Sequence, residues 1–180
     1  GSVAVVIGDG PIGLLHIQLL RHQGAFTVMV GLLDHRLDVA KKLGANVVID
    51  ASREDIEQVV REVSDGRGAD IVVNAVGKAA VLRQAIDLAA RRGQVLYFAA
   101  TLEPKVELDL DLIHYKELRI IGSYDSIVAQ YEQALALINA DIIKAKLLIS
   151  HRLPLEEIQF GYEIARKQEG VKVLIIHAGG

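Results

Sequence analysis

An α/β fold with one parallel sheet, covered by helices on both faces, is predicted by three features of this 180-residue sequence. Short β-branched runs alternate with amphipathic segments along most of the chain. The runs are continuously apolar, as expected of strands that are buried on both faces. Aromatic residues make up only 4% of the sequence although 51% is hydrophobic, which favours helices layered on a sheet over a β-sandwich.

Six strands are expected before residue 123, at 3–7, 27–31, 46–49, 71–75, 94–98 and 119–122. Segments with helical periodicity cover 12–23, 36–43, 53–64, 79–91 and 126–139. Residues 101–117 form a longer loop of mixed charge with a helical turn near 112–117. Because crossovers between parallel strands are right-handed, these elements favour a doubly wound sheet with strand order 3-2-1-4-5-6.

Local signals predict several helix ends. Ser52 and Asp55 have the spacing of a capping box at the start of helix 53–64. Asp34 is expected to cap helix 36–43. A left-handed terminator is expected at the glycines that follow three of the helices, namely Gly24, Gly44 and Gly93.

Charge and composition exclude several classes of function. The net charge of −3 gives no indication of a nucleic-acid partner or of an anionic membrane surface. No apolar run approaches the roughly 20 residues of a membrane span, and the N-terminus is not a signal peptide. With no cysteine, the chain has no disulfide and no thiolate metal site, and a cytoplasmic location is expected. The six histidines lack metal-site spacing, so we assign no catalytic and no metal-binding residue.

A glycine-rich loop, GDGPIG at residues 8–13, joins strand 3–7 to the first helix. Gly8 allows the tight turn, Gly10 lets the backbone approach a diphosphate, and Gly13 allows close packing of helix on strand. Pro11 suits the first helical turn, where its missing N–H costs nothing. Since the free N–H groups of a helix start attract anions, the loop at the first strand–helix junction predicts a Rossmann dinucleotide-binding domain.

The choice of dinucleotide depends on the end of the second strand, where an acid usually binds a ribose hydroxyl. Here that position is Gly31, which has no carboxylate. Arg36 lies five residues later and would attract a 2′-phosphate; the alternative for Arg36 is a solvated charge on the helix. NADP is therefore favoured over NAD, with NAD kept as the alternative.

Five runs of the sequence carry a family resemblance. They are GDGPIGLLHIQLLRHQGA, DHRLDVAKKLGANVVID and GADIVVNAVG in the first half, and KELRIIGSY and LLISHRLPLEEIQFGYEIARKQEGVKVLI later. Together these runs, from Val3 to about Ile176, resemble the zinc-dependent medium-chain alcohol and polyol dehydrogenases. The GPIG form of the loop is similar above all to the sorbitol and threonine dehydrogenase branch. The resemblance implies hydride transfer between a secondary alcohol and NAD(P), a small alcohol or ketone as substrate, and a homodimer or homotetramer.

The resemblance also implies roles for residues at the cofactor site. Ile12 would pack behind the diphosphate, Gly31 would adjoin the adenosine ribose, and Arg36 would lie alongside that ribose. The nicotinamide end would contact backbone groups of Phe98, Ala99 and Ala100, and would be flanked by Gly122, Ser123 and Tyr124.

In the family that it resembles, a preceding domain provides the zinc ligands, so zinc is expected only in a full-length enzyme. Residues 1–146 are then the cofactor domain, and 147–180 are a return segment that normally packs on the missing domain. That segment reads as strand 147–152, helix 155–168 and strand 172–177. Its strands, without their usual partner, are expected to pair with each other or with another copy. The isolated chain should bind cofactor without catalysis.

Two other functions fit parts of the sequence. A stand-alone module that senses NAD(P) would need the same glycine loop and no catalytic residues. A methyltransferase also has a glycine loop after its first strand, but it usually keeps an acid where this chain has Gly31.

Overall fold

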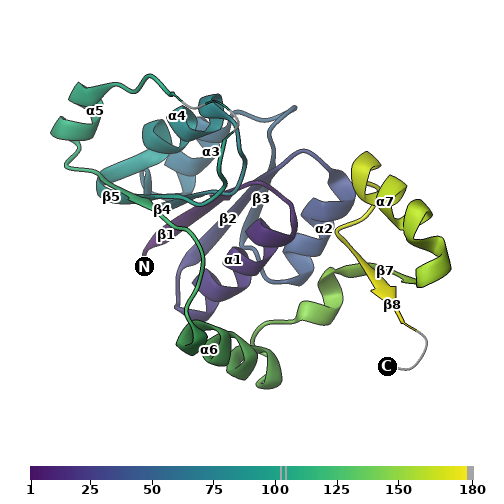
Figure 1. The fold of residues 1–180 in the computed structure, drawn as a ribbon. Coiled ribbons are helices and arrows are strands. Elements are labelled where there is room, and N and C mark those ends of the chain that lie inside the picture. Colours follow the sequence, from purple (N-terminus) through teal and green to yellow (C-terminus); the bar gives the residue numbers. More distant parts are fainter. Residues whose placement is uncertain (102, 104, 178–180) are drawn as a thin grey trace.

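The computed structural model, which describes residues 1–101, 103 and 105–177, has the predicted α/β fold (Figure 1). Its main sheet is parallel and six-stranded, in the predicted order β3-β2-β1-β4-β5-β6. The strands are β1 (Val3–Ile7), β2 (Phe26–Gly31), β3 (Val47–Asp50), β4 (Ala69–Asn74), β5 (Ala89–Tyr97) and β6 (Arg119–Gly122). The helices along this part of the chain are α1 (Pro11–His22), α2 (Asp34–Lys42), α3 (Ile56–Val63), α4 (Ala79–Leu88), α5 (Leu110–Tyr115) and α6 (Val128–Asn139). Residues 102 and 104 of the predicted loop lie outside the described residues.

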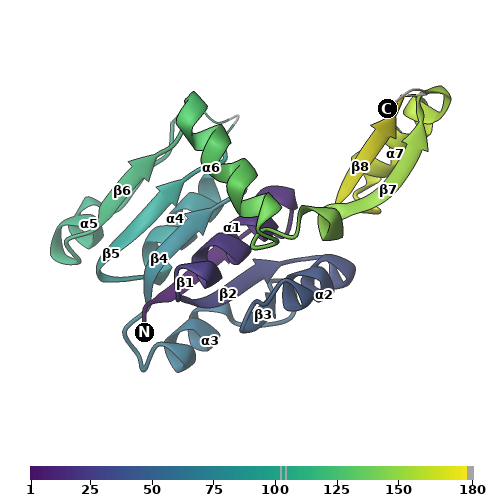
Figure 2. The same ribbon diagram turned by 90° about the horizontal axis from the view of Figure 1, so that it is seen from below.

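Helices cover both faces of the sheet, which explains why the central strands β1 and β2 are largely apolar and buried. Val5 of β1 belongs to the core layer under α3 and α4, together with Val60 and Ile86. The next residue, Val6, belongs to the opposite layer under α1 and α2. Figure 2 shows α1 and α6 in front of the sheet and α4 behind it. Each fully buried Val or Ile side chain of this kind contributes about 1.5–3 kcal/mol to folding.

The C-terminal part forms the expected β-α-β unit, with β7 (Ile149–Pro154), α7 (Ile158–Lys167) and β8 (Lys172–Ile176). Strands β7 and β8 pair with each other in parallel, in a sheet separate from the main one. The unit lies on the α2 side of the molecule (Figure 1). It is tied there by Arg36, whose Nε and Nη2 donate to the carbonyl of Gly170 at 3.1 and 2.5 Å. Residues 178–180 of the predicted return segment lie outside the described residues.

Two predicted helix starts are wrong. Helix α3 begins at Ile56, where the carboxylate of Asp55 accepts the N–H of Gln58 at 3.0 Å, so Asp55 caps the helix. The hydroxyl of Ser52 instead donates to Asp50 at 2.6 Å, because the chain turns once more after β3. Asp34 is the first residue of α2 and not its cap, and its carboxylate accepts hydrogen bonds from Arg53 at 3.2 Å.

The end of α4 also differs from its prediction. The helix stops at Leu88, and β5 begins at the next residue, so Gly93 lies inside a strand and does not terminate a helix. The left-handed conformation falls on the neighbouring Arg92, with φ of 62°. Gly24 and Gly44 do have positive φ, at 84° and 96°, as predicted. Within the described residues, no helix is long and apolar enough to cross a membrane.

Candidate functional site

The carboxyl ends of the central strands lie in one row, because their register is fixed by parallel pairing. Ile7 of β1 is opposite Asn74 of β4, which is opposite Tyr97 of β5, and Tyr97 is opposite Gly122 of β6. The segments that follow these strands therefore emerge at one edge of the sheet. Strand order reverses between β1 and β4, and ligands of doubly wound sheets bind in the crevice at that reversal.

The glycine loop after β1 is closely packed on its helix. Gly8 has φ of +119°, and its N–H donates to the carbonyl of Val30 at 2.8 Å. A Cβ on Gly13 would overlap the carbonyl oxygen of Gly8, so only glycine lets α1 lie this close. A Cβ on Gly10 would meet nothing within 4 Å, so open space lies in front of this residue. The loop thus offers bare backbone to a ligand at Gly10.

The first turn of α1 is suited to an anion. Gly10 is its N-cap and Pro11 its first residue, and within the described residues no side chain caps this turn and no acid lies in it. The N–H groups of Ile12 and Gly13 have no carbonyl partner within the helix. Together with the positive end of the helix dipole, they form a cradle that fits a diphosphate. The side chain of Ile12 is 42% exposed beside this cradle.

The end of β2 holds a carboxylate that does not come from β2. A Cβ on Gly31 would lie 2.6 Å from both Cβ and Oδ2 of Asp9, the second residue of the glycine loop. Oδ2 of Asp9 accepts the N–H groups of Leu32 and Leu33 at 2.8 and 2.9 Å. Oδ1 lies 3.8 Å from Nη1 of Arg36. The loop after β2 is therefore held by the loop after β1.

Arg36 is not a solvated charge, so that alternative is wrong. The residue is 8% exposed, with its guanidinium between Asp9 on one side and the carbonyl of Gly170 on the other. Helix α2 turns Arg36 inward together with Leu37, since both face the core side. One cation thus joins the glycine loop to the C-terminal unit.

Buried Asn74 organises the segments after β4 and β5. Its backbone carbonyl accepts the N–H groups of Phe98 and Ala99 at 3.2 and 3.1 Å. Its Oδ1 accepts the N–H of Val76 at 3.0 Å, while its Nδ2 has no partner among the described residues. Ala100 continues this segment, and its carbonyl leaves no room for a side chain on Gly77.

The aromatic ring of Phe98 rests edge-on against His16 of α1, with ring centroids 4.8 Å apart and planes at 78°. Burial lowers the pKa of the His16 side chain, and its hydrogen bond to the carbonyl of Ile12 opposes that shift only in part. The lowered pKa favours the neutral form of the His16 ring. This ring extends from α1, the helix that follows the glycine loop, and packs against Phe98 just after β5.

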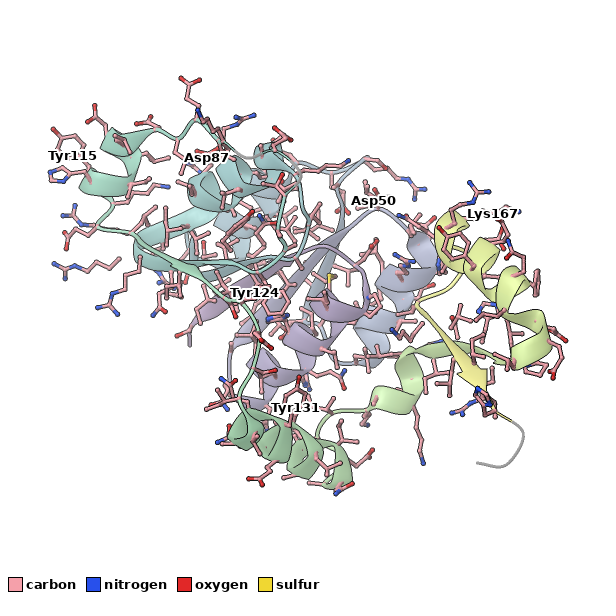
Figure 3. All side chains as sticks on the ribbon, in the orientation of Figure 1. Asp50, Asp87, Tyr115, Tyr124, Tyr131 and Lys167 are labelled. Atoms are coloured by element: carbon pink, nitrogen blue, oxygen red, sulfur yellow. The ribbon has the colours of Figure 1, made fainter. Side chains whose placement is uncertain are left out.

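The segment after β6 lies at the far end of the row. Ser123 donates its N–H to the carbonyl of Tyr97 at 3.3 Å, which continues the β5–β6 pairing by one residue. Tyr124 is 97% exposed on the segment between β6 and α6, where Figure 3 labels it. Within the described residues, no group of three or more histidines or acids could hold a metal ion.

Comparison with known proteins identifies the family. A profile described as zinc-binding dehydrogenase matches residues 11–140. The chain belongs to the zinc-binding dehydrogenase family. It is 34% identical over 177 residues to a sorbitol dehydrogenase of Halalkalibacterium halodurans and 31% identical over 179 residues to an L-threonine 3-dehydrogenase of Bacillus velezensis. These matches cover 97% and 98% of the chain but 52% and 51% of those proteins, so the chain spans about half of their length.

A solved structure of an alcohol dehydrogenase agrees with the fold. The alcohol dehydrogenase TADH from Thermus sp. ATN1 superposes with a TM-score of 0.93 at 31% identity. The match covers 99% of this chain and 51% of that one. The superposed part of this chain therefore includes its glycine loop, six-stranded sheet and C-terminal unit.

The structure of this zinc-binding dehydrogenase chain brings most of the predicted site residues to one edge. Residues 8–13, Gly31, 98–100 and 122–124 all follow or end strands whose carboxyl ends lie there. Sequence reasoning missed Asp9 and Asn74. Asn74 had a signal, since a polar residue ends the apolar run IVVN. Asp9 had none beyond being an acid inside the glycine loop.

Proposed function

We propose that this chain is the nicotinamide-dinucleotide-binding part of a zinc-dependent alcohol or polyol dehydrogenase. The observation that carries the proposal is the cradle at Gly10, where open space faces the free N–H groups of the first turn of α1. The likeness to sorbitol and threonine dehydrogenases supports hydride transfer between a secondary alcohol and the nicotinamide.

The predicted residues other than Arg36 then have a place along the dinucleotide. Residues 8–13 hold the diphosphate, with Ile12 packed beside it, and the end of β2 faces the adenosine ribose. The nicotinamide lies toward residues 98–100 and 122–124. Their backbone is held in place by Asn74 and Tyr97, so the ring meets a preformed surface. The edge from β2 to β6 spans the two ends of such a cofactor.

Zinc, as part of a full-length enzyme, supplies a Lewis acid that polarises the alcohol or ketone oxygen. The described residues of this chain do not fit that metal, since they contain no suitable ligand cluster. We propose that the ligands and the substrate site belong to a part of the protein outside this sequence. The isolated chain would then bind cofactor and leave alcohols unreacted.

The C-terminal unit supports this arrangement. Its apolar residues Leu155, Ile158 and Phe160 are all exposed, as expected of a surface that packs against further protein. We accordingly propose residues 1–146 as the cofactor domain and 147–180 as a segment that returns to the catalytic domain. The exposed edge of β6 supports a homodimer or homotetramer, because unpaired parallel edges favour association. The lack of cysteine supports a cytoplasmic location.

Titration of the chain with NADH and with NADPH, followed by calorimetry and by nicotinamide fluorescence, tests the proposal. We expect saturable binding of one dinucleotide per chain and loss of affinity in Gly10→Ala, whose methyl group enters the cradle. Binding of neither dinucleotide would overturn the proposal. The preference for NADP over NAD, predicted from Gly31 and Arg36, remains a prediction, and its premise of a free Arg36 is not met.

A further inference from the structure

The starting observation is the shared space of Gly31 and Asp9. A side chain on Gly31 would begin 2.6 Å from Cβ and Oδ2 of Asp9, so the two positions cannot both carry side chains in this conformation. Asp9 is 9% exposed, and its carboxylate lies at the end of β2. The end of β2 has no acid of its own, but the carboxylate of Asp9 lies there in the folded chain.

In dinucleotide-binding folds an acid at this strand end accepts a hydrogen bond from the adenosine ribose. We propose that Asp9 takes that role from within the glycine loop, and that its charge makes the chain prefer NAD(H) over NADP(H). This inference rests on the proposed dinucleotide binding. It replaces the argument that Gly31 leaves a 2′-phosphate unopposed.

The two oxygens of Asp9 have different partners. Oδ2 accepts both backbone N–H groups of Leu32 and Leu33, which fixes the carboxylate at the strand end. Oδ1 accepts no hydrogen bond from the described residues and faces Arg36 at 3.8 Å. Oδ1 is thus the oxygen that can accept a hydrogen bond from the 2′-hydroxyl of the ribose. A phosphate in place of that hydroxyl removes the donor and sets two negative groups against each other.

Neighbouring charges do not reverse this preference. Arg36 is the nearest cation, but two of its nitrogens donate to Gly170 and its third faces Asp9. On the other side, Gly31 is opposite Asp50 at the end of β3. The Asp50 carboxylate is engaged by Ser52 and Arg53, whose hydrogen bond and charge lower its pKa. The strand ends beside the ribose position therefore carry two carboxylates, and the arginines beside them, Arg36 and Arg53, are each held by contacts within the chain.

The test measures the dissociation constants of NADH and NADPH for the unmodified chain and two variants at one ionic strength. Asp9→Asn keeps an oxygen for the N–H groups of Leu32 and Leu33 but removes the charge. Asp9→Gly combined with Gly31→Asp returns the acid to the strand; glycine is needed because the Cβ of residue 9 would itself clash. Asp55→Asn is the matched control, an acid-to-amide change at the cap of α3, where the carboxylate accepts the N–H of Gln58.

We expect the unmodified chain to bind NADH about tenfold more tightly than NADPH, Asp9→Asn to lose most of that ratio, and the double variant to regain it. The control should keep the ratio of the unmodified chain. An unchanged ratio in Asp9→Asn, or tighter binding of NADPH by the unmodified chain, would overturn the inference while dinucleotide binding stands. Binding of neither cofactor by the unmodified chain would defeat the proposed function itself. Should Asp9→Asn melt at a lower temperature, the double variant decides, since a lost preference there overturns the inference.

Discussion

The carbonyl oxygen of Gly8 occupies the space that a side chain on Gly13 would need. This contact joins the residue after β1 to the first turn of α1 and sets the distance between strand and helix. At Gly10, by contrast, an added Cβ would meet nothing within 4 Å. Gly13 therefore allows close packing of the helix on the strand, and Gly10 leaves open space for a ligand. The difference can be measured.

Gly13→Ala should lower both stability and dinucleotide affinity, because the loop must move to admit the methyl group. The free energy of unfolding should fall by about 1–3 kcal/mol, as in other overpacked sites. Gly10→Ala should lower affinity by a similar factor and leave the melting temperature within error. Urea unfolding and calorimetric titration of both variants check the pair. Equal losses of stability in the two variants would contradict the assignment.

Arg36→Ala should loosen the C-terminal unit from the sheet. It removes two hydrogen bonds to the carbonyl of Gly170, and charged hydrogen bonds of this kind are worth about 1.5–3 kcal/mol. Hydrogen exchange should become faster in β7 and β8 and stay unchanged in β1. Arg61→Ala, which breaks an exposed pair with Glu57 on α3, is the control and should cost well under about 1 kcal/mol. Unchanged exchange in the C-terminal unit of Arg36→Ala would show that Arg36 does not hold it.

His16 should make stability fall in mild acid. Its pKa is lower in the folded chain than in the unfolded chain, so between the folded value and about 6.5 the unfolded state binds more protons. Stability is therefore full above about pH 6.5, falls as the pH drops through that window, and levels off below the folded pKa. Urea unfolding of the unmodified chain and of His16→Gln, at about pH 7.5 and pH 5.5, measures the difference. The variant should lose part of the dependence, and identical pH profiles would rule out His16 as its source.

Asp55→Ala should destabilise α3 by about 1 kcal/mol, because it removes the acceptor for the N–H of Gln58. Asp55→Asn should keep most of that stability, since asparagine caps as well as aspartate. Thermal unfolding of the two variants tests the cap. A larger loss in Asp55→Asn than in Asp55→Ala would disprove it.

Strand order and the place of the glycine loop could be predicted because both depend on local periodicity and on general rules of chain connection. The run at 3–7 is apolar over its whole length and the run at 119–122 is apolar after Arg119, and both strands have the predicted bounds. The end of α4 could not, because Ala89 continues an apolar helical pattern and becomes a strand only by pairing with Ala69. Local preference is outweighed there by a partner twenty residues away.

The candidate site was predictable in part for the same reason. Glycines at 8, 10 and 13 act through the backbone within one turn, so their pattern is visible in the sequence. The carboxylate at the end of β2 comes from residue 9, twenty-two positions before Gly31, and no periodicity links the two. The anchoring role of Arg36 could not be predicted for a similar reason, since its acceptor, the carbonyl of Gly170, lies 134 residues along the chain.

The double attachment of Arg36 matters to anyone who redesigns coenzyme preference in this chain. A library that randomises position 36 would select for retained anchoring of β7 and β8 as much as for a new coenzyme. A selected variant could then owe its activity to a stable fold and not to a changed coenzyme preference. Leu32 is the better position for introducing a cation, because it is 61% exposed beside the same strand end and its apolar side chain, unlike that of Arg36, has no hydrogen bond to lose. Selection at position 32 would separate coenzyme choice from the integrity of the fold.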